Sequence, residues 1–336
     1  MIAGVGALLA VACGVALIGA VIAAVHHAEL IAHRVGEPFG TLVLAVAVTI
    51  IEASLILSIM LAGGPDAAAL PRDTIYAAIM IICNGVVGLC ILVGGLVHHE
   101  QSFRVEGSSA GLAALIALSA FSLVLPAFTT TTSGGTYSTA QLVFVAVTSA
   151  ALWAVYVFTQ TVRHRDYFLP PVDASSPDAH AAPPTNREAW VSFALLVVSL
   201  VSVVGLAKLL SPLIEHAVEQ AGAPKAVIGI VIAMLVLLPE TWAAVRAAHA
   251  NRLQTSMNLA LGSALATIGL TIPVVAVTGI ALGIPLILGL GPKDLVMLAV
   301  TLLLSAVTLG TGRTHMMQGA VHLVVFAAFL FLAFLP

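Results

Sequence analysis

Long apolar stretches alternate with short polar connections along almost the whole chain. A helix needs about 20 apolar residues to cross the hydrocarbon core of a bilayer, and in lipid it satisfies its own backbone polar groups. We place ten such apolar cores, at residues 3–25, 39–62, 74–97, 109–127, 140–162, 189–211, 225–248, 256–280, 294–310 and 318–335. The pattern therefore predicts an all-α integral membrane protein with ten transmembrane helices.

One polar segment interrupts this alternation near the middle of the chain. Residues 163–187, RHRDYFLPPVDASSPDAHAAPPTNR, are rich in Pro, Ala and Asp and show no apolar periodicity, which is typical of a flexible linker. The linker divides the chain into residues 1–162 and 188–336, with five helices in each part. Because five is odd, the second part enters the membrane with the opposite orientation. This arrangement predicts two inverted five-helix repeats with a binding site between them near the midplane.

Composition supports a membrane protein and excludes other classes. Of the 336 residues, 60% are hydrophobic and 8% are charged, well outside the ordinary globular range. The net charge is -3, and no run of Lys or Arg could neutralise a nucleic-acid backbone, so we exclude nucleic acid as a partner. Cys13, Cys83 and Cys90 are far apart within apolar stretches, a spacing that indicates neither a disulfide framework nor a metal site.

The basic residues predict the orientation of the chain. The first apolar stretch leads into His26, His27 and Glu29 instead of a cleavage site, so we expect it to stay as a spanning helix. Only three basic residues fall in one set of connections: Arg72, Lys225 and Lys293. Eight fall in the alternate connections: Arg34, Arg104, Arg163, Arg165, Arg187, Arg246, Arg252 and Arg313. Since positive charge favours the cytoplasmic side, the linker is predicted to be cytoplasmic and both termini outside.

Two glutamates lie inside predicted spanning helices, each in the second helix of its half. Glu52 is the fourteenth residue of the stretch that starts at Phe39, roughly 20 Å along the helix axis. Glu240 follows Pro239 in VLLPETWAAVRAAHANR; the apolar run before the proline is too short to span, so the helix must continue past Glu240. A charged residue at this depth costs on the order of 3 kcal/mol or more and usually marks an ion or proton pathway. The alternative is a protonated structural residue bonded to a neighbouring helix.

The helix after each glutamate offers further oxygen atoms. Asn84 lies in IICNGVVGLCILVGGL, and Ser263, Thr267 and Thr271 recur every four residues on one face of the helix that follows Glu240. Amide and hydroxyl oxygens beside two carboxylates would suit a hard cation such as Ca²⁺. For Thr267 and Thr271, hydroxyls bonded to their own helix are an equally good interpretation.

Two stretches resemble a known family. GEPFGTLVLAVAVTIIEASLI (36–56) and LPETWAAVRAAHANRLQTSMNLALGSALATIGLTIP (238–273) are similar to the two alpha-repeats of the cation/calcium exchanger superfamily, and above all to its bacterial sodium-potassium/calcium-proton antiporter branch. Proton-coupled calcium exchangers carry Gly-Asn-Ala-Thr/Ala-Glu in each repeat, with the glutamate binding both cation and proton. The resemblance places those glutamates on Glu52 and Glu240.

The same resemblance identifies supporting positions and departures. The motif asparagine falls on Thr49, which keeps an oxygen, and on Leu237, which offers none. The Gly-Ser and Ser-Asn of the following helices fall on Gly262-Ser263 and Cys83-Asn84. Pro239 also departs from the motif, and it removes a backbone donor to the carbonyl of residue 235. Two interpretations stay open: local unwinding that offers this carbonyl to a cation, or a simple kink.

The resemblance implies a secondary antiporter of the bacterial inner membrane that exchanges cytoplasmic Ca²⁺, Na⁺ or K⁺ for protons by alternating access. Its partners would be inorganic cations, protons and the lipid bilayer, with no cofactor and no enzymatic activity. Two ionised glutamates in a poorly hydrated site repel each other, so the site favours the protonated or the cation-loaded form. The alternatives are a sodium-driven calcium exchanger, an intramembrane lipid-modifying enzyme that uses the glutamates as acid and base, and a scaffold without transport.

Histidine is frequent near the predicted cytoplasmic ends of the helices. His26 and His27 end the first stretch and His98 and His99 end the third, so the two pairs are predicted to lie on one side. They could sense cytoplasmic pH or bind a regulatory metal, or they could be solvated helix ends. His322, inside the last stretch, is predicted to be a buried histidine with satisfied hydrogen bonds.

Overall fold

The computed structural model describes residues 2–36, 39–63, 68–169, 184–220, 222, 224 and 226–335. The first part holds α1 (Ile2–Val35), α2 (Phe39–Gly63), α3 (Leu70–Met80), α4 (Val87–His98), β1 (Glu100–Ser102), α5 (Val105–Ser119) and α6 (Thr139–Phe158). The second holds α7 (Asn186–Gln220), α8 (Ala226–His249), α9 (Leu253–Leu282), α10 (Pro292–Leu309), β2 (Arg313–His315) and α11 (Met316–Phe334). Stretches of π-helix continue three of the helices: η2 (Ile81–Val86), η3 (Ala120–Val124) and η5 (Thr159–Arg163). The chain also forms two short 3₁₀ helices, η4 (Leu125–Ala127) and η6 (Arg165–Phe168).

The predicted fold class is confirmed: the protein is a predominantly helical, multi-pass membrane protein. Within the described residues, eight helical segments are long and apolar enough to cross a membrane. The two arms of α8, Ala226–Leu238 and Glu240–His249, meet at 53° and count as a ninth span if taken together. In α2 the apolar helix found among the described residues is Val46–Ser58, shorter than a span. The count of ten spans therefore stays a prediction.

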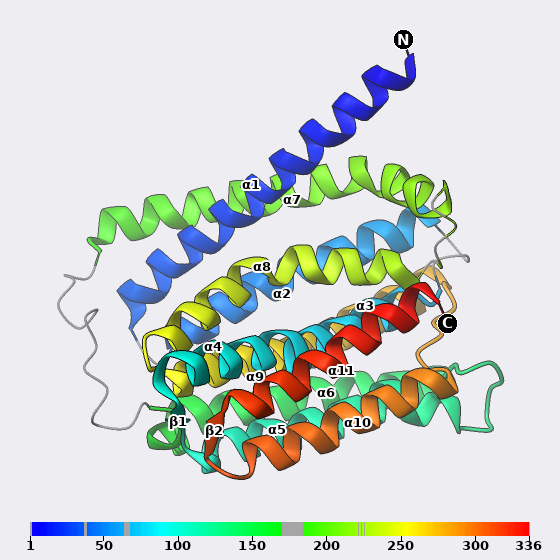
Figure 1. Ribbon diagram of the computed structural model, residues 1–336. Helices are drawn as coiled ribbons and strands as arrows, with labels where there is room; N and C mark the ends of the chain where they lie inside the picture. Colours follow the sequence, from blue (N-terminus) through cyan, green and yellow to red (C-terminus); the bar gives the residue numbers. More distant parts are fainter. Residues whose placement is uncertain are drawn as a thin grey trace.

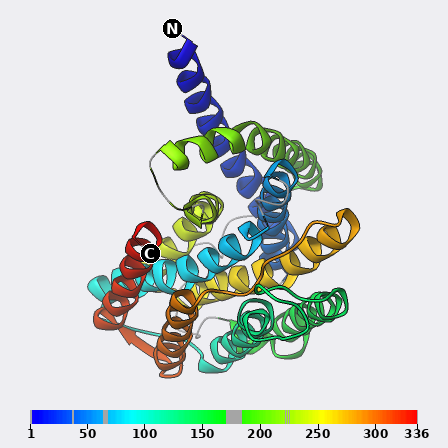
Figure 2. The same cartoon turned by 90° about the vertical axis from the view of Figure 1, so that its right-hand side faces the viewer.

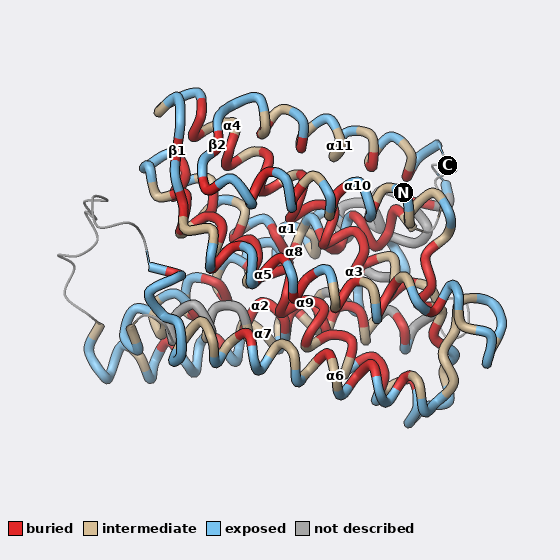
Figure 3. Tube along the Cα trace, turned by 90° about the horizontal axis from the view of Figure 1, so that it is seen from below, coloured by how far each residue is buried: buried red, intermediate tan, exposed pale blue. Residues whose placement is uncertain are grey.

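The helices form layers (Figure 1). In Figures 1 and 2, α1 and α7 lie together on one side of the molecule, α5, α6 and α10 lie on the opposite side, and the other helices lie between them. One hydrophobic cluster joins α1 and α7 to α2 and α8, and a larger one holds most of the rest. Figure 3 shows the buried positions concentrated in the central helices. In the apolar window of Leu70–His98, 78% of the residues are buried, against 18% in that of Asn186–Leu210, so the rest of the chain covers little of this part of α7.

The α1 and α7 helices run antiparallel. Near the end of α1, the Arg34 Nε atom donates a hydrogen bond of 3.1 Å to the Asn186 side-chain oxygen at the start of α7. Both helices are longer than predicted, since the cores were placed at 3–25 and 189–211. Polar residues beyond each core continue the helix, because a helical backbone is stable at the membrane interface as well as in lipid.

Helices from the two halves alternate in the centre of the molecule. The most extensive pairings there are α3 with α8, α2 with α9, α4 with α11 and α6 with α9. The α4 and α11 helices approach closely at two glycines: a Cβ atom on Gly319 would lie 2.7 Å from the Gly88 carbonyl oxygen and 2.4 Å from the Leu92 nitrogen. Glycines at this contact allow the two helix backbones to approach closely.

One short antiparallel strand pair, β1 with β2, accompanies the helices. Glu100 pairs with His315 and Ser102 with Arg313, where α4 ends and α11 begins. Three-residue strands carry too little alternation to be predicted. Beside this pair, the Gln101 side-chain nitrogen donates to the Ala248 carbonyl at 2.8 Å, so the sheet also holds the end of α8.

The predicted linker falls mostly outside the described residues. Residues 163–169 and 184–187 belong to the described chain, and residues 170–183 do not. The domain boundaries at 163 and 188 stay predictions. All three cysteines are free, and Cys83 and Cys90 are buried, as expected for small core residues.

Candidate cation site

The two predicted glutamates come from different halves of the chain and lie near each other in the core. Glu52 on α2 is 2% exposed and Glu240 on α8 is 9% exposed. Their carboxyl groups accept hydrogen bonds from hydroxyls one turn apart on the same helix. The structure therefore brings together two acidic groups that are 188 positions apart in the sequence.

A single helix, α9, contacts both carboxyl groups. The Ser263 hydroxyl donates a hydrogen bond of 2.7 Å to Glu240 Oε2, and one turn later the Thr267 hydroxyl donates one of 2.7 Å to Glu52 Oε2. The spacing of four residues places these hydroxyls on one face of α9, as the sequence predicted. Within the described residues, the second oxygen of Glu52, Oε1, is buried and has no hydrogen-bond partner. This oxygen can accept a proton or contact a cation.

The bend in α8 shapes the site around Glu240. The backbone is helical from Ala226 to His249 but turns by 53° between Leu238 and Glu240, where Pro239 removes one helical hydrogen bond. Of the two interpretations of Pro239, the structure favours the kink. A cavity of about 10 Å³, enough for roughly one water molecule, lies beside the bend. Its polar lining is Glu240, Thr241 and Ser263, and Thr241 was not predicted as a site residue.

Thr49 on α2 and Thr271 on α9, two further predicted residues, are both buried. Thr49 lies one helical turn before Glu52 on α2 and is 4% exposed, so it belongs to the same buried face. Thr271 lies one turn beyond Thr267 and is fully buried, but within the described residues its hydroxyl has no hydrogen-bond partner. The hydrogen bonds that α9 donates to the glutamates therefore come from Ser263 and Thr267.

Asn84 is placed differently from the prediction. Its side-chain nitrogen donates to the Thr301 hydroxyl at 2.8 Å, and its oxygen lies 3.3 Å from His322 Nδ1. Among the described residues, no hydrogen bond joins Asn84 to either glutamate. Asn84 lies in the π-helical stretch η2, while Ile82 and Val86 of the same stretch line the Glu240 cavity. The extra residue per turn of a π-helix changes which side chains face each neighbour, and apolar periodicity does not reveal it.

His322 is a buried histidine with both ring nitrogens satisfied, as predicted. Its Nε2 atom lies 3.1 Å from the Thr308 hydroxyl, and its Nδ1 atom faces Asn84. The close approach of α4 and α11 at Gly88 and Gly319 brings His322 within reach of Asn84. Polar groups of η2, α10 and α11 thus form a hydrogen-bond network, which the sequence did not predict as a unit.

The structure shows contacts for three of the four histidines proposed as pH sensors and the backbone conformation of the fourth. The rings of His26 and His27 lie 5.4 Å apart. His98 Nε2 donates to the His249 carbonyl at 2.8 Å, and His99 ends α4 with a positive φ of 63°. No group of three or more His, Cys, Asp or Glu side chains suited to a metal ion occurs in the part of the chain that the structure describes. pH sensing by these histidines stays a prediction.

Removal of the α9 hydroxyls should weaken cation binding selectively. We expect Ser263→Ala and Thr267→Ala each to lower apparent cation affinity about tenfold, because each removes a hydrogen bond to a charged group. Thr271→Ala is the matched control on the same helix face and should leave affinity within about twofold. Affinity is measured from the cation dependence of transport. Equal effects of all three variants would contradict the assignment of Ser263 and Thr267 to the site.

The site and fold define a class: a multi-pass helical membrane protein with two buried carboxyl groups contributed by different halves and held by one helix. The family model described as "Sodium/calcium exchanger protein" matches residues 5–162 and 191–335. The chain therefore belongs to the sodium/calcium exchanger protein family.

Relatives and solved structures agree with this membership. The chain is 52% identical over 320 residues to the putative ionic transporter y4hA of Sinorhizobium fredii, covering 95% of this chain and 87% of that protein. It is 36% identical over 323 residues to the sodium-potassium/proton antiporter ChaA of Escherichia coli, with the same coverage. Its fold is similar to that of native YfkE, with a TM-score of 0.74 at 19% identity over 98% of this chain and 92% of that one. The predicted relation to the ChaA branch is confirmed.

Proposed function

We propose that this protein is a secondary antiporter that exchanges Ca²⁺, Na⁺ or K⁺ for protons, with Glu52 and Glu240 as the shared binding groups. The observation that carries the proposal is that each buried glutamate accepts a hydrogen bond from α9, at Ser263 or Thr267. The names of the relatives give independent support, since one is a sodium-potassium/proton antiporter and another, from Aphanothece halophytica, is a Ca²⁺/H⁺ antiporter.

The coupling follows from charge at a buried site. Two ionised carboxylates are unfavourable in a region poorly accessible to water. About two protons, or one Ca²⁺, or one Na⁺ or K⁺ with one proton, would neutralise the pair. A cation and protons therefore compete for the same oxygens. If only the neutral forms reorient between the two sides of the membrane, a proton gradient drives export of the cation.

The same proposal includes two inverted repeats. Three observations support it: α1 and α7 run antiparallel, Glu52 and Glu240 lie in corresponding second helices, and one family model matches both halves. The central pairings are also related by exchange of the halves, because α2 with α9 corresponds to α8 with α3. We further propose a location in the bacterial inner membrane with both termini outside, on the distribution of basic residues. We propose no cofactor and no enzymatic activity.

Proton movement in everted membrane vesicles tests this function. Cells that express the protein should give vesicles in which added Ca²⁺, Na⁺ or K⁺ dissipates a preformed proton gradient. Vesicles without the protein are the control, and separate additions rank the cations. A calcium flux that requires a sodium gradient and is independent of protons would favour the sodium-driven exchanger. Turnover of lipid without any cation flux would favour the intramembrane enzyme.

A further inference from the structure

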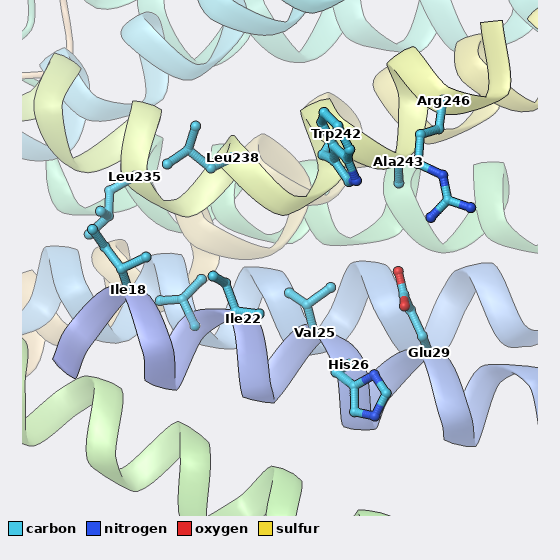
Figure 4. Close-up of a pocket in the computed structure, with 11 residues that line it drawn as sticks. Ile18, Ile22, Val25, His26, Glu29, Leu235, Leu238, Trp242, Ala243 and Arg246 are labelled. Carbon is cyan, nitrogen blue, oxygen red and sulfur yellow. The ribbon is translucent and has the colours of Figure 1, made fainter. Parts of the chain in front are cut away.

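A crevice separates α1 from α8 on the side of α8 that faces the α1 layer (Figure 4). Its volume is about 360 Å³, far larger than the cavity at Glu240. Most of its lining is apolar and comes from both helices: Ile18, Val21, Ile22, Val25, Leu235, Leu238 and Trp242. Ala243 and three residues that can carry charge complete the lining: His26, Glu29 and Arg246. The crevice is therefore amphipathic.

The polar and apolar ends of the crevice are ordered along the two helices. Ile18 and Leu235 line the apolar end, and Glu29 and Arg246 lie eleven residues further along their respective helices. At 1.5 Å per residue this is about 16 Å, close to half of the roughly 30 Å hydrocarbon core. The crevice therefore has the depth of one leaflet, with its charged end at one membrane interface.

The charged end offers one group of each sign. Figure 4 shows the Glu29 carboxylate extending toward α8 and the Arg246 guanidinium extending toward α1. Both side chains are exposed, and the structure records no ion pair between them. A guanidinium suits a phosphate, and a carboxylate suits an ammonium group. Both charges are complementary to a head group that carries a phosphate and a primary ammonium.

We propose that this crevice binds one phospholipid with a primary-ammonium head group, of the phosphatidylethanolamine type. One acyl chain lies between α1 and α8, the phosphate contacts Arg246 and the ammonium contacts Glu29. The lipid fills the space between two helices that touch each other only sparsely. Because Leu238 and Trp242 flank Glu240 on α8, the bound chain also supports the bent segment that carries the cation site.

Fluorescence quenching in vesicles tests this site, because Trp242 lines it. In a variant with Trp153→Phe and Trp190→Phe, Trp242 is the sole tryptophan, and lipids with brominated acyl chains quench it on contact. The matched reporter keeps Trp190, which is 72% exposed on α7, and replaces the other two. Brominated phosphatidylethanolamine and phosphatidylglycerol are compared in otherwise identical vesicles. This readout does not depend on transport.

We expect phosphatidylethanolamine to reach half-maximal quenching of Trp242 at about fivefold lower content than phosphatidylglycerol, as one added ion pair at an exposed site would give. Trp190 should not distinguish the two lipids. Glu29→Gln should abolish the preference, and Glu106→Gln, an exposed acid outside the crevice, should leave it unchanged. Equal quenching of Trp242 by both lipids would overturn the proposal in favour of ordinary lipid contact. Absence of quenching would overturn it in favour of a water-filled crevice.

Discussion

Glu52→Gln and Glu240→Gln should each reduce cation-dependent proton movement by about 100-fold or more, since each removes a charged ligand that a buried cation requires. Glutamine has nearly the size of glutamate, and its amide oxygen can still accept the hydrogen bond from Thr267 or Ser263. The loss should therefore appear in transport and not in folding. The measurement is proton movement in everted vesicles at equal protein content.

The control for these variants is Glu106→Gln. Glu106 is an exposed acid in the first turn of α5, and its replacement should leave transport unchanged. All variants should elute as folded protein in detergent with unchanged helix content. Wild-type rates in both site variants would rule out Glu52 and Glu240 as the shared binding groups.

The largest effect on stability is expected at Gly319. A methyl group there would meet backbone atoms of α4, the Leu92 nitrogen at 2.4 Å and the Gly88 oxygen at 2.7 Å, so the two helices must separate. We expect Gly319→Ala to lower the free energy of unfolding by about 1–3 kcal/mol, the usual range for overpacking. The separation should also lengthen the contact between His322 and Asn84. The measurement is thermal unfolding of the purified protein in detergent.

Gly205→Ala is the matched control for this prediction. Gly205 lies in α7, and a Cβ atom there would meet nothing within 4 Å. Alanine should be neutral or slightly stabilising there, because it has the higher helix propensity. Equal unfolding temperatures for the two variants would show that the close approach of α4 and α11 is not required.

The positions of the glutamates could be predicted because burial of a carboxyl group in lipid is costly and rare. One argument from length, that the run before Pro239 cannot span, was enough to place Glu240 within the membrane. In the structure both glutamates are buried and accept hydrogen bonds from α9. The hydroxyl spacing on α9 was also visible, because polar residues every four positions share a helix face.

Other features of the structure depend on contacts between helices, and the sequence of a single helix does not reveal them. Nothing in the sequence around Asn84 indicates a π-helical stretch or a hydrogen bond to Thr301, 217 positions away. The continuation of α1 to Val35 was missed because hydropathy detects the apolar core and not the helix beyond it. The sequence shows the proline in α8 but not the 53° angle between its two arms.

Competition between cation and proton at one pair of carboxyl groups is the central claim, and proton release on cation binding tests it most directly. The purified protein, in weakly buffered detergent solution near neutral pH, is titrated with Ca²⁺, Na⁺ or K⁺ while pH is recorded. We predict release of up to about two protons per Ca²⁺ bound, and no release by the Glu52→Gln, Glu240→Gln double variant. Cation binding by the wild-type protein without proton release, or undiminished release by the double variant, would contradict the account.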